Sequence, residues 1–164
     1  MSGTPTAPQA GTLIAGLDPG RSKCGLVLAD AERKQVLEAA ILPPQDCVSL
    51  LQDWHHKGLG AVLVGNGTGS SSWQQQLLLL SLQSELVNEH GSTLAARQRY
   101  WDLDPPSSWT RLMPPGLRLP PRDIDDVVAQ LLVERHLGIQ LQRTSTAVQR
   151  TLTPPLGKLW ATGV

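Results

Sequence analysis

Residues 13–30 have the sequence LIAGLDPGRSKCGLVLAD, two short apolar runs separated by a turn that contains Pro19 and Gly20. The first run ends on Asp18 and the second begins at Gly25. Apolar runs of this length, bounded by turn residues, are typical of buried strands. The segment therefore predicts two strands joined by a tight turn, with a carboxylate at the end of the first strand.

Along the rest of the chain, apolar spacing predicts further strands and helices. We expect strands at 12–18, 25–29, 35–42, 61–64 and 84–89, and helices at 46–58, 71–84, 92–101 and 123–138. Asp46 and Ser92 are the expected N-caps of their helices, because such side chains accept hydrogen bonds from free backbone N–H groups. Three consecutive strands followed by alternating helices and strands predict an α/β fold. Its five-stranded mixed sheet would join a three-strand meander to βαβ strands, with helices on both faces.

The 164 residues suit one domain. We expect a disordered lead-in at 1–11, the domain at 12–138 and an extended tail at 139–164. Within the domain, the proline-rich stretch 102–122 predicts a long irregular loop, a kind of segment that is usually functional or mobile. The sequence has no Phe and one Tyr, so Leu and Val must form most of the core.

Charge and cysteine content narrow the class of protein. The 14 basic and 14 acidic residues cancel, so any site for a polyanion must be a local patch. Cys24 and Cys47 suggest neither a disulfide framework nor a zinc site, and we expect both to be buried in a reducing cytoplasm. The first residues do not resemble a signal peptide, and the apolar run 77–80 is too short to cross a membrane. We therefore expect a cytoplasmic protein without a membrane partner.

Four acidic residues lie where predicted elements end or begin. Asp18 ends the first strand, Glu89 ends the fifth, and Asp125 and Asp126 open the last helix. If the first and fifth strands are parallel, their acids reach the same sheet edge, where α/β sheets bind ligands. Carboxylates gathered there raise one another's pKa unless a cation neutralises them, and such oxygen ligands select Mg²⁺ or Mn²⁺. Two such ions about 4 Å apart suit phosphoryl displacement.

Four segments together, at 13–30, 61–70, 86–97 and 123–134, resemble in order and spacing the motifs of YqgF-type nucleases. These are RNase H-like proteins related to the RuvC Holliday-junction resolvases. The resemblance implies an RNase H-like fold over about 12–138 and a metal-dependent endonuclease. It implies that Asp18, Glu89 and Asp125 are catalytic, and that these three and Asp126 hold Mg²⁺ or Mn²⁺. YqgF-type proteins are associated with maturation of the small-subunit ribosomal RNA precursor.

The sequence departs from the family pattern at three places. Asn88 stands where the family has an Asp before the Glu, which removes one potential charged ligand. The stretch 65–67, Gly-Asn-Gly, stands where the resolvases carry an acid, which favours a YqgF-type protein. Ser22 stands where YqgF relatives often have Lys, although Arg21 and Lys23 flank it.

Basic residues near these motifs predict a local nucleic-acid surface. Arginines alternate with aromatic residues in and before the proline-rich loop, and such side chains hold single strands. The expected nucleic-acid contacts are Arg21, Lys23, Asn66, Arg97, Arg99 and Arg118. An exposed helix and a packed loop are the alternative for these arginines. The expected partner is nucleic acid, RNA rather than DNA, and a homodimer stays open.

Simpler roles are open for the acids as well. Asp18 could start a turn, Glu89 could be a solvated acid, and Asp125 could favour the helix dipole, with Asp123 as the cap. The leading hypothesis is a metal-dependent endonuclease that processes ribosomal RNA precursor. The alternatives are a Holliday-junction-resolvase-like DNA nuclease, a non-catalytic RNA or ribosome-assembly factor on the same fold, and a nucleotide-binding fragment of the actin and sugar-kinase type, for which the chain is short.

Overall fold

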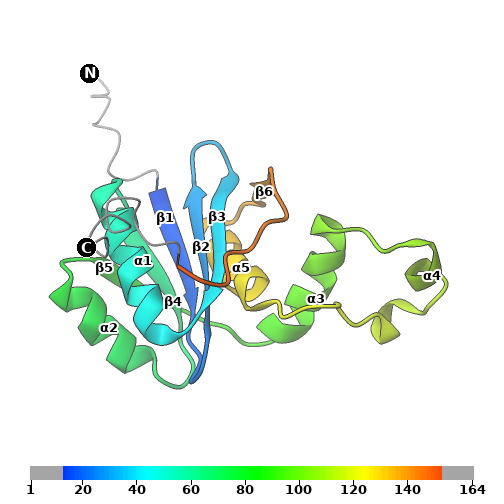
Figure 1. The fold of residues 1–164 in the computed structure, drawn as a ribbon, viewed down its shortest axis with the longest axis horizontal. Coiled ribbons are helices and arrows are strands. Elements are labelled where there is room, and N and C mark those ends of the chain that lie inside the picture. Colours follow the sequence, from blue (N-terminus) through cyan, green and yellow to red (C-terminus); the bar gives the residue numbers. More distant parts are fainter. Residues whose placement is uncertain (1–12, 153–164) are drawn as a thin grey trace, which may run out of the picture.

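The computed structural model describes residues 13–152, so the expected lead-in and the end of the tail lie outside the described residues (Figure 1). The strands are β1 (Leu13–Asp18), β2 (Cys24–Asp30), β3 (Gln35–Leu42), β4 (Ala61–Gly65), β5 (Gln83–Val87) and β6 (Gln142–Arg143). The helices are α1 (Pro44–His56), α2 (Ser70–Leu79), α3 (Ser92–Leu103), α4 (Ser108–Arg111) and α5 (Asp125–Leu137), with a 3₁₀ turn, η1, at Pro115–Leu117.

The strands form one mixed sheet in the order β5-β4-β1-β2-β3-β6. β1, β2 and β3 are an antiparallel meander, and β4 and β5 continue the sheet parallel to β1. This confirms the predicted α/β fold, in which a three-strand meander is joined to βαβ strands. The predicted number of five strands is one too few, because β6 pairs with β3 in parallel within the segment expected to be an extended tail.

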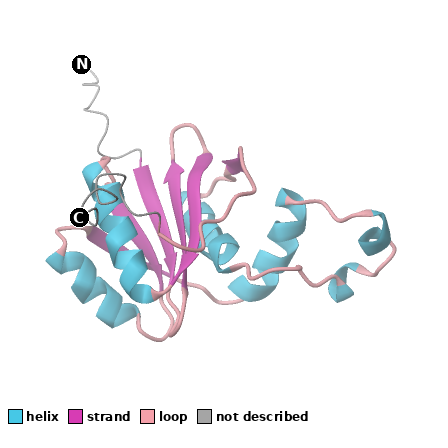
Figure 2. Ribbon diagram, viewed as in Figure 1, coloured by secondary structure: helices cyan, strands magenta, loops and turns pink. Residues whose placement is uncertain are grey.

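Helices cover both faces of the sheet (Figure 2). On one face, α1 and α2 pack against alternate residues of the strands, with Trp54 and Leu77 fully buried. On the other face, α5 packs through Ala129, Leu132 and Val133. α3 lies outside α5 and buries Tyr100 against it. Leu, Val and Ala supply most of the core, as the absence of Phe predicts.

The first turn of α5 lies directly on the sheet because β2 has a glycine there. A Cβ at Gly25 would collide with the backbone oxygen of Asp125. Gly25 is also the residue that pairs with Asp18 across β1 and β2. Because Gly25 has no side chain, the start of α5 can lie next to the end of β1.

The predicted helix caps are wrong. Pro43 is the N-cap of α1 and Asp46 lies inside its first turn, because a proline suits the start of a helix and its fixed φ sets the chain direction. Gly91, with a positive φ, precedes α3 in place of a side-chain cap, and Ile124, not Asp123, is the N-cap of α5.

Several element boundaries also differ from the prediction, and β5, for example, ends at Val87 rather than at residue 89. α2 ends at Leu79 rather than at residue 84, because the chain must turn before β5 begins at Gln83. The segment 102–122, expected to be irregular, contains the end of α3, the short helix α4 and the 3₁₀ turn. Cys24 and Cys47 are buried free cysteines, as expected. No helix in the described part of the chain combines the length and hydropathy needed to span a bilayer.

Candidate active site

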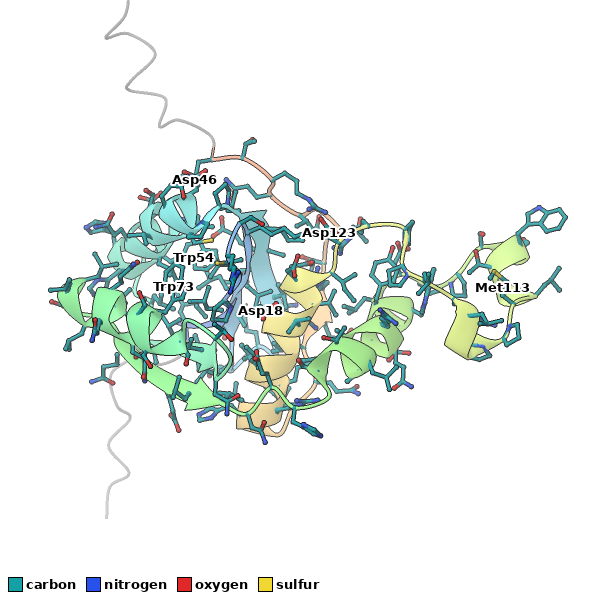
Figure 3. The ribbon with its side chains drawn as sticks, turned by 90° about the horizontal axis from the view of Figure 1, so that it is seen from below. Asp18, Asp46, Trp54, Trp73, Met113 and Asp123 are labelled. Carbon is teal, nitrogen blue, oxygen red and sulfur yellow. The ribbon has the colours of Figure 1, made fainter. Side chains whose placement is uncertain are left out.

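Two of the predicted acids lie at the same edge of the sheet. Asp18 is the last residue of β1, and Glu89 lies two residues beyond the end of β5. β4 lies between these strands and is parallel to both, so all three end on the same side. Figure 3 shows Asp18 beside α5. The fold therefore places the acids of the first and fifth strands at a common edge, as the sequence predicts.

Two glycines make room for the side chain of Glu89. A Cβ at Gly65, the end of β4, would lie 2.5 Å from Glu89 Oε2. A Cβ at Gly67 would collide with Glu89 Oε1. The Glu89 carboxylate therefore lies over the end of β4, between the ends of β1 and β5. Gly65 and Gly67, which stand where the resolvases carry an acid, therefore leave the space that this carboxylate occupies.

Hydrogen bonds fix the turn that carries Glu89. The backbone N–H of Glu89 donates to the side-chain oxygen of Asn66 at 3.3 Å. The side-chain oxygen of Asn88 accepts from the backbone N–H of His90 at 2.9 Å. Arg135 of α5 donates to the backbone oxygens of Asn88 and His90. Asn88 thus stabilises the turn from within, and Arg135 of α5 holds the turn in place from outside.

The three acids predicted to be catalytic influence one another electrostatically. Burial, and to a smaller extent the carboxylates of Asp125 and Glu89, raise the pKa of Asp18 to about 7. Asp18 is only partly buried, so solvent still reaches its side chain. A carboxylic acid with this pKa, beside two further acids at a sheet edge, marks a candidate functional site.

Lys23, on the turn between β1 and β2, is the cation nearest to this group. Its ammonium forms an ion pair with Asp123 and lies 3.5 Å from Asp125 Oδ2. The hydrogen bond to Asp123 raises the pKa of Lys23 and lowers that of Asp123. Lys23 therefore offsets part of the negative charge of Asp125.

Asp126 does not belong to this group, although it was predicted as a metal ligand. It is fully buried, and its two carboxylate oxygens accept hydrogen bonds from Arg122 and Arg143. Both oxygens are therefore already paired with guanidinium groups. Because Asp126 is the next residue after Asp125 on the helix, its side chain points in a different direction from that of Asp125. We therefore leave Asp126 out of the candidate site.

The donor set of Asp18, Glu89 and Asp125 suits Mg²⁺ or Mn²⁺, since hard cations prefer carboxylate oxygens. Burial is the largest cause of the raised pKa of Asp18, and repulsion by the carboxylates of Asp125 and Glu89, which such a cation would relieve, adds to it. Within residues 13–152, however, no three His, Cys, Asp or Glu side chains are grouped as a metal-binding cluster. The expectation that the three acids share one ion therefore stays a prediction.

The residues predicted to contact nucleic acid fall into two groups. Arg21 is exposed and borders a surface hollow of about 450 Å³, next to Thr68 and Ser72 at the start of α2. Arg97, on α3, is exposed as well. Together with Lys23 and Asn66 they lie on the surface or at the site. These positions are accessible to a large ligand.

The other two predicted contacts have structural partners. Arg99 is largely buried and donates to both carboxylate oxygens of Glu134 and to the backbone oxygen of Leu141. Arg118 donates to three backbone oxygens of the loop in which it lies. Arg99 is therefore removed from the predicted surface, because its guanidinium holds α3, α5 and the β6 segment together.

Sequence reasoning overlooked Asp123 as a neighbour of the site and Gly67 as part of it. Asp123 was expected to cap α5, but it pairs with Lys23, a hundred residues away in the chain. The repeated glycines of Gly65 and Gly67, directly after a buried strand, were the available signal that another group occupies this space.

Comparison with known proteins adds a likeness in fold. No protein-family model matches the sequence, and no curated protein does. Among solved structures, the chain is similar to T. thermophilus RuvC in complex with Holliday junction substrate, with a TM-score of 0.43 and 15% sequence identity. The alignment covers 76% of this chain and 96% of that one.

Proposed function

We propose that this protein is a metal-dependent endonuclease that hydrolyses phosphodiester bonds, with a ribosomal RNA precursor as the favoured substrate. The observation that supports the proposal is the position of Asp18 at the end of β1, where burial and the carboxylates of Asp125 and Glu89 raise its pKa to about 7. The RNA substrate rests on the resemblance of the four sequence motifs to YqgF-type nucleases.

Asp18, Glu89 and Asp125 would hold Mg²⁺ or Mn²⁺. When bound, such a cation neutralises the carboxylates and gives electrophilic assistance to phosphodiester hydrolysis. Asp18, whose pKa is raised to about 7, would bind the cation in its ionised form. Glu89 is kept in position by Asn66 and by the two glycines beneath its carboxylate.

Residues around the acids would hold the nucleic-acid backbone. Arg21 borders the hollow next to the start of α2, and a guanidinium there favours a phosphate. Lys23 lies beside Asp125, with its ammonium 3.5 Å from Oδ2, and would contact a phosphate near the scissile bond. The carboxamide oxygen of Asn66 already accepts a hydrogen bond from the backbone N–H of Glu89. A contact between Asn66 and substrate would therefore use the side-chain N–H groups of Asn66. These local charges are consistent with a chain whose formal net charge is zero.

A cleavage assay tests this function. The substrates are an RNA that spans the end of the small-subunit ribosomal RNA precursor and a four-way DNA junction, each with Mg²⁺ and with EDTA. We expect Asp18→Asn, Glu89→Gln and Asp125→Asn each to lower the rate at least about 100-fold, because changes even to outer partners of metal ligands cost 10- to 100-fold. Glu85→Gln, at an exposed acid on β5, is the matched control. Equal rates in all variants would reject the nuclease.

A non-catalytic RNA-binding factor on the same fold is the second candidate. The lack of a metal-binding cluster within residues 13–152 favours it, as does the neutral Asn88 beside Glu89. The same assay separates the two candidates. A binding factor would retain RNA affinity without cleaving, and the acid substitutions would leave that affinity unchanged or raise it by removing negative charge.

A further inference from the structure

Residues 104–122, which we call the arm, connect α3 to α5 and project away from the sheet. Figure 1 shows the arm as the most remote part of the described chain, and Met113 labels it in Figure 3. It carries α4 and the 3₁₀ turn η1. The arm presents large apolar side chains to solvent, which are Trp109, Leu112, Met113, Leu117 and Leu119. Trp109 is 83% exposed, so most of its side chain is accessible to solvent.

The arm has a defined internal structure. Arg118 donates to the backbone oxygens of Thr110, Met113 and Arg111, at 2.8–3.0 Å. The indole N–H of Trp101, on α3, donates to the backbone oxygen of Arg118 at 3.1 Å and fixes the arm to the helix. These hydrogen bonds connect distant parts of the arm and so restrict the movement of its backbone. The apolar side chains are therefore exposed while the backbone that carries them is held in place.

The exposed arm is positively charged. Between residues 104 and 122 there are three arginines and one aspartate, Asp104, whose carboxylate accepts a hydrogen bond from Tyr100. Arg122 pairs with Asp126, but neither Arg111 nor Arg118 forms an ion pair within the described residues. Their charges are uncompensated in a chain whose formal net charge is zero, so the arm attracts phosphate groups.

The arm is connected to the candidate active site at both ends. α3, which leads into it, begins three residues after Glu89. The chain that leaves it passes through Arg122 and Asp123, the partner of Lys23, to Asp125. Both segments that hold the arm therefore begin or end within a few residues of the acids, and Arg97 on α3 is exposed.

We propose that the arm binds unpaired nucleic acid, with Trp109 stacked on an exposed base and the charges of Arg111 and Arg118 attracting the adjacent phosphates. Apolar side chains on a projecting tip act as wedges between bases, and tryptophan offers a large face for stacking. A stable protein interface uses about 20–30 residues a side, which is more than this tip provides. The inference rests on the proposed function and names its substrate class: strands with unpaired bases, not continuous duplex.

Binding measured without cleavage tests the arm separately from the nuclease. Fluorescence anisotropy in EDTA would compare labelled single-stranded RNA, single-stranded DNA of the same sequence and a blunt duplex. We expect Trp109→Ala to weaken single-strand binding roughly 5- to 150-fold, the range for loss of one base–aromatic stack, and to leave duplex binding unchanged. The comparison of RNA with DNA identifies the preferred strand.

Three controls make the test specific. Trp109→Phe keeps an aromatic face and should restore most of the affinity, whereas Trp109→Leu keeps only apolar area and should not. Leu79→Ala removes an apolar side chain that is 85% exposed on α2 and should have no effect. Circular dichroism should show every variant folded, because these side chains are exposed.

The proposal is overturned if Trp109→Ala binds single strands as the wild type does, or if the wild type binds none of the probes. It is also overturned if sedimentation shows that Trp109→Ala converts a dimer to a monomer with unchanged affinity, since the arm would then hold a second copy of this chain. None of these results depends on cleavage by Asp18, so the proposed nuclease can stand or fall separately.

Discussion

Asp125 and Asp126 are adjacent in the first turn of α5, yet the fold gives their carboxylates opposite surroundings. Asp126 is fully buried and bonded to two guanidinium groups at 2.8 Å. Asp125 is partly exposed and lies with Asp18 and Glu89, with Lys23 as its cation at 3.5 Å. One acid is neutralised by the protein's own arginines. The other belongs to a group whose negative charge is left largely uncompensated.

The neutralised side is a buried polar network that extends along α5. Arg143 of β6 donates to Gln130 as well as to Asp126. Glu134, one turn further, accepts from Arg99 and from the backbone N–H of Leu141. This network joins α3, α5 and the segment after α5. The difference teaches that buried acids with arginine partners hold the structure, and that acids gathered without such partners are available for a ligand.

The difference between the two acids predicts the largest loss of stability for substitution of Asp126. Asp126→Asn leaves Arg122 and Arg143 without their counter-charge in a buried position, and loss of one partner from such a pair destabilises a protein by about 3–5 kcal/mol. Asp125→Asn should change the free energy of unfolding by less than about 0.5 kcal/mol, or increase it, because it relieves repulsion. Urea unfolding of both variants measures this. Equal losses would show that the two acids have the same role.

The second prediction concerns the pH dependence of stability at Asp18. Its pKa is about 7 in the folded protein against 3.8 in an unfolded chain, so the folded state is penalised as the pH rises from about 4 to 7. The full penalty is present above pH 7. Asp18→Asn removes it, and should increase the free energy of unfolding by ~2 kcal/mol at pH 8, a value below the full shift because Asp18 is partly exposed.

Two controls belong to this experiment. At pH 4 the variant and the wild type should have similar stability, since Asp18 then carries its proton in the folded protein. Addition of Mg²⁺ at pH 8 should stabilise the wild type and leave Asp18→Asn nearly unchanged, because only the wild type binds the ion tightly in its folded state. A variant that is less stable than the wild type at pH 8 would contradict the proposed repulsion.

The sequence alone could predict the sheet and the acids because both depend on short-range patterns. Apolar runs with turn residues located the first five strands, and their ends located Asp18 at the end of β1 and Glu89 two residues after β5. The surroundings of each acid could not be predicted in this way. Asp126 meets Arg143 through β6, a two-residue strand with no periodic signal, and Asp123 meets Lys23 only through the tertiary fold.

The helix caps show the same limit on a smaller scale. Asp46, Ser92 and Asp123 all have side chains that suit an N-cap, but another residue is the N-cap of each helix. Pro43 and Gly91 fix the backbone direction there, through a restricted φ and a positive φ respectively. Propensity identifies residues that are able to cap, whereas the path of the chain decides which one does.

The third prediction separates the position of Glu89 from the stability of the fold. Gly67→Ala places a methyl group where Glu89 Oε1 lies, and the flexible carboxylate can move aside at little cost to folding. Cleavage should fall about tenfold, equivalent to ~1.4 kcal/mol of transition-state stabilisation, while the free energy of unfolding stays within about 0.5 kcal/mol. Gly116→Ala, where nothing lies within 4 Å of the added Cβ, is the matched control.

The smallest effect is expected at Lys23, the one cation that the protein itself places beside the uncompensated acids in the described residues. Lys23→Gln should raise the affinity for Mg²⁺ roughly two- to threefold, because a partly exposed ion pair that competes for Asp125 contributes under about 1 kcal/mol. Lys57→Gln, which removes an exposed partner of Glu38, should leave Mg²⁺ affinity unchanged. Calorimetric titration measures both. If Lys23→Gln instead weakens Mg²⁺ binding, the lysine positions Asp125 rather than competing for it, and the site would resemble the Asp126 network in relying on an internal cation.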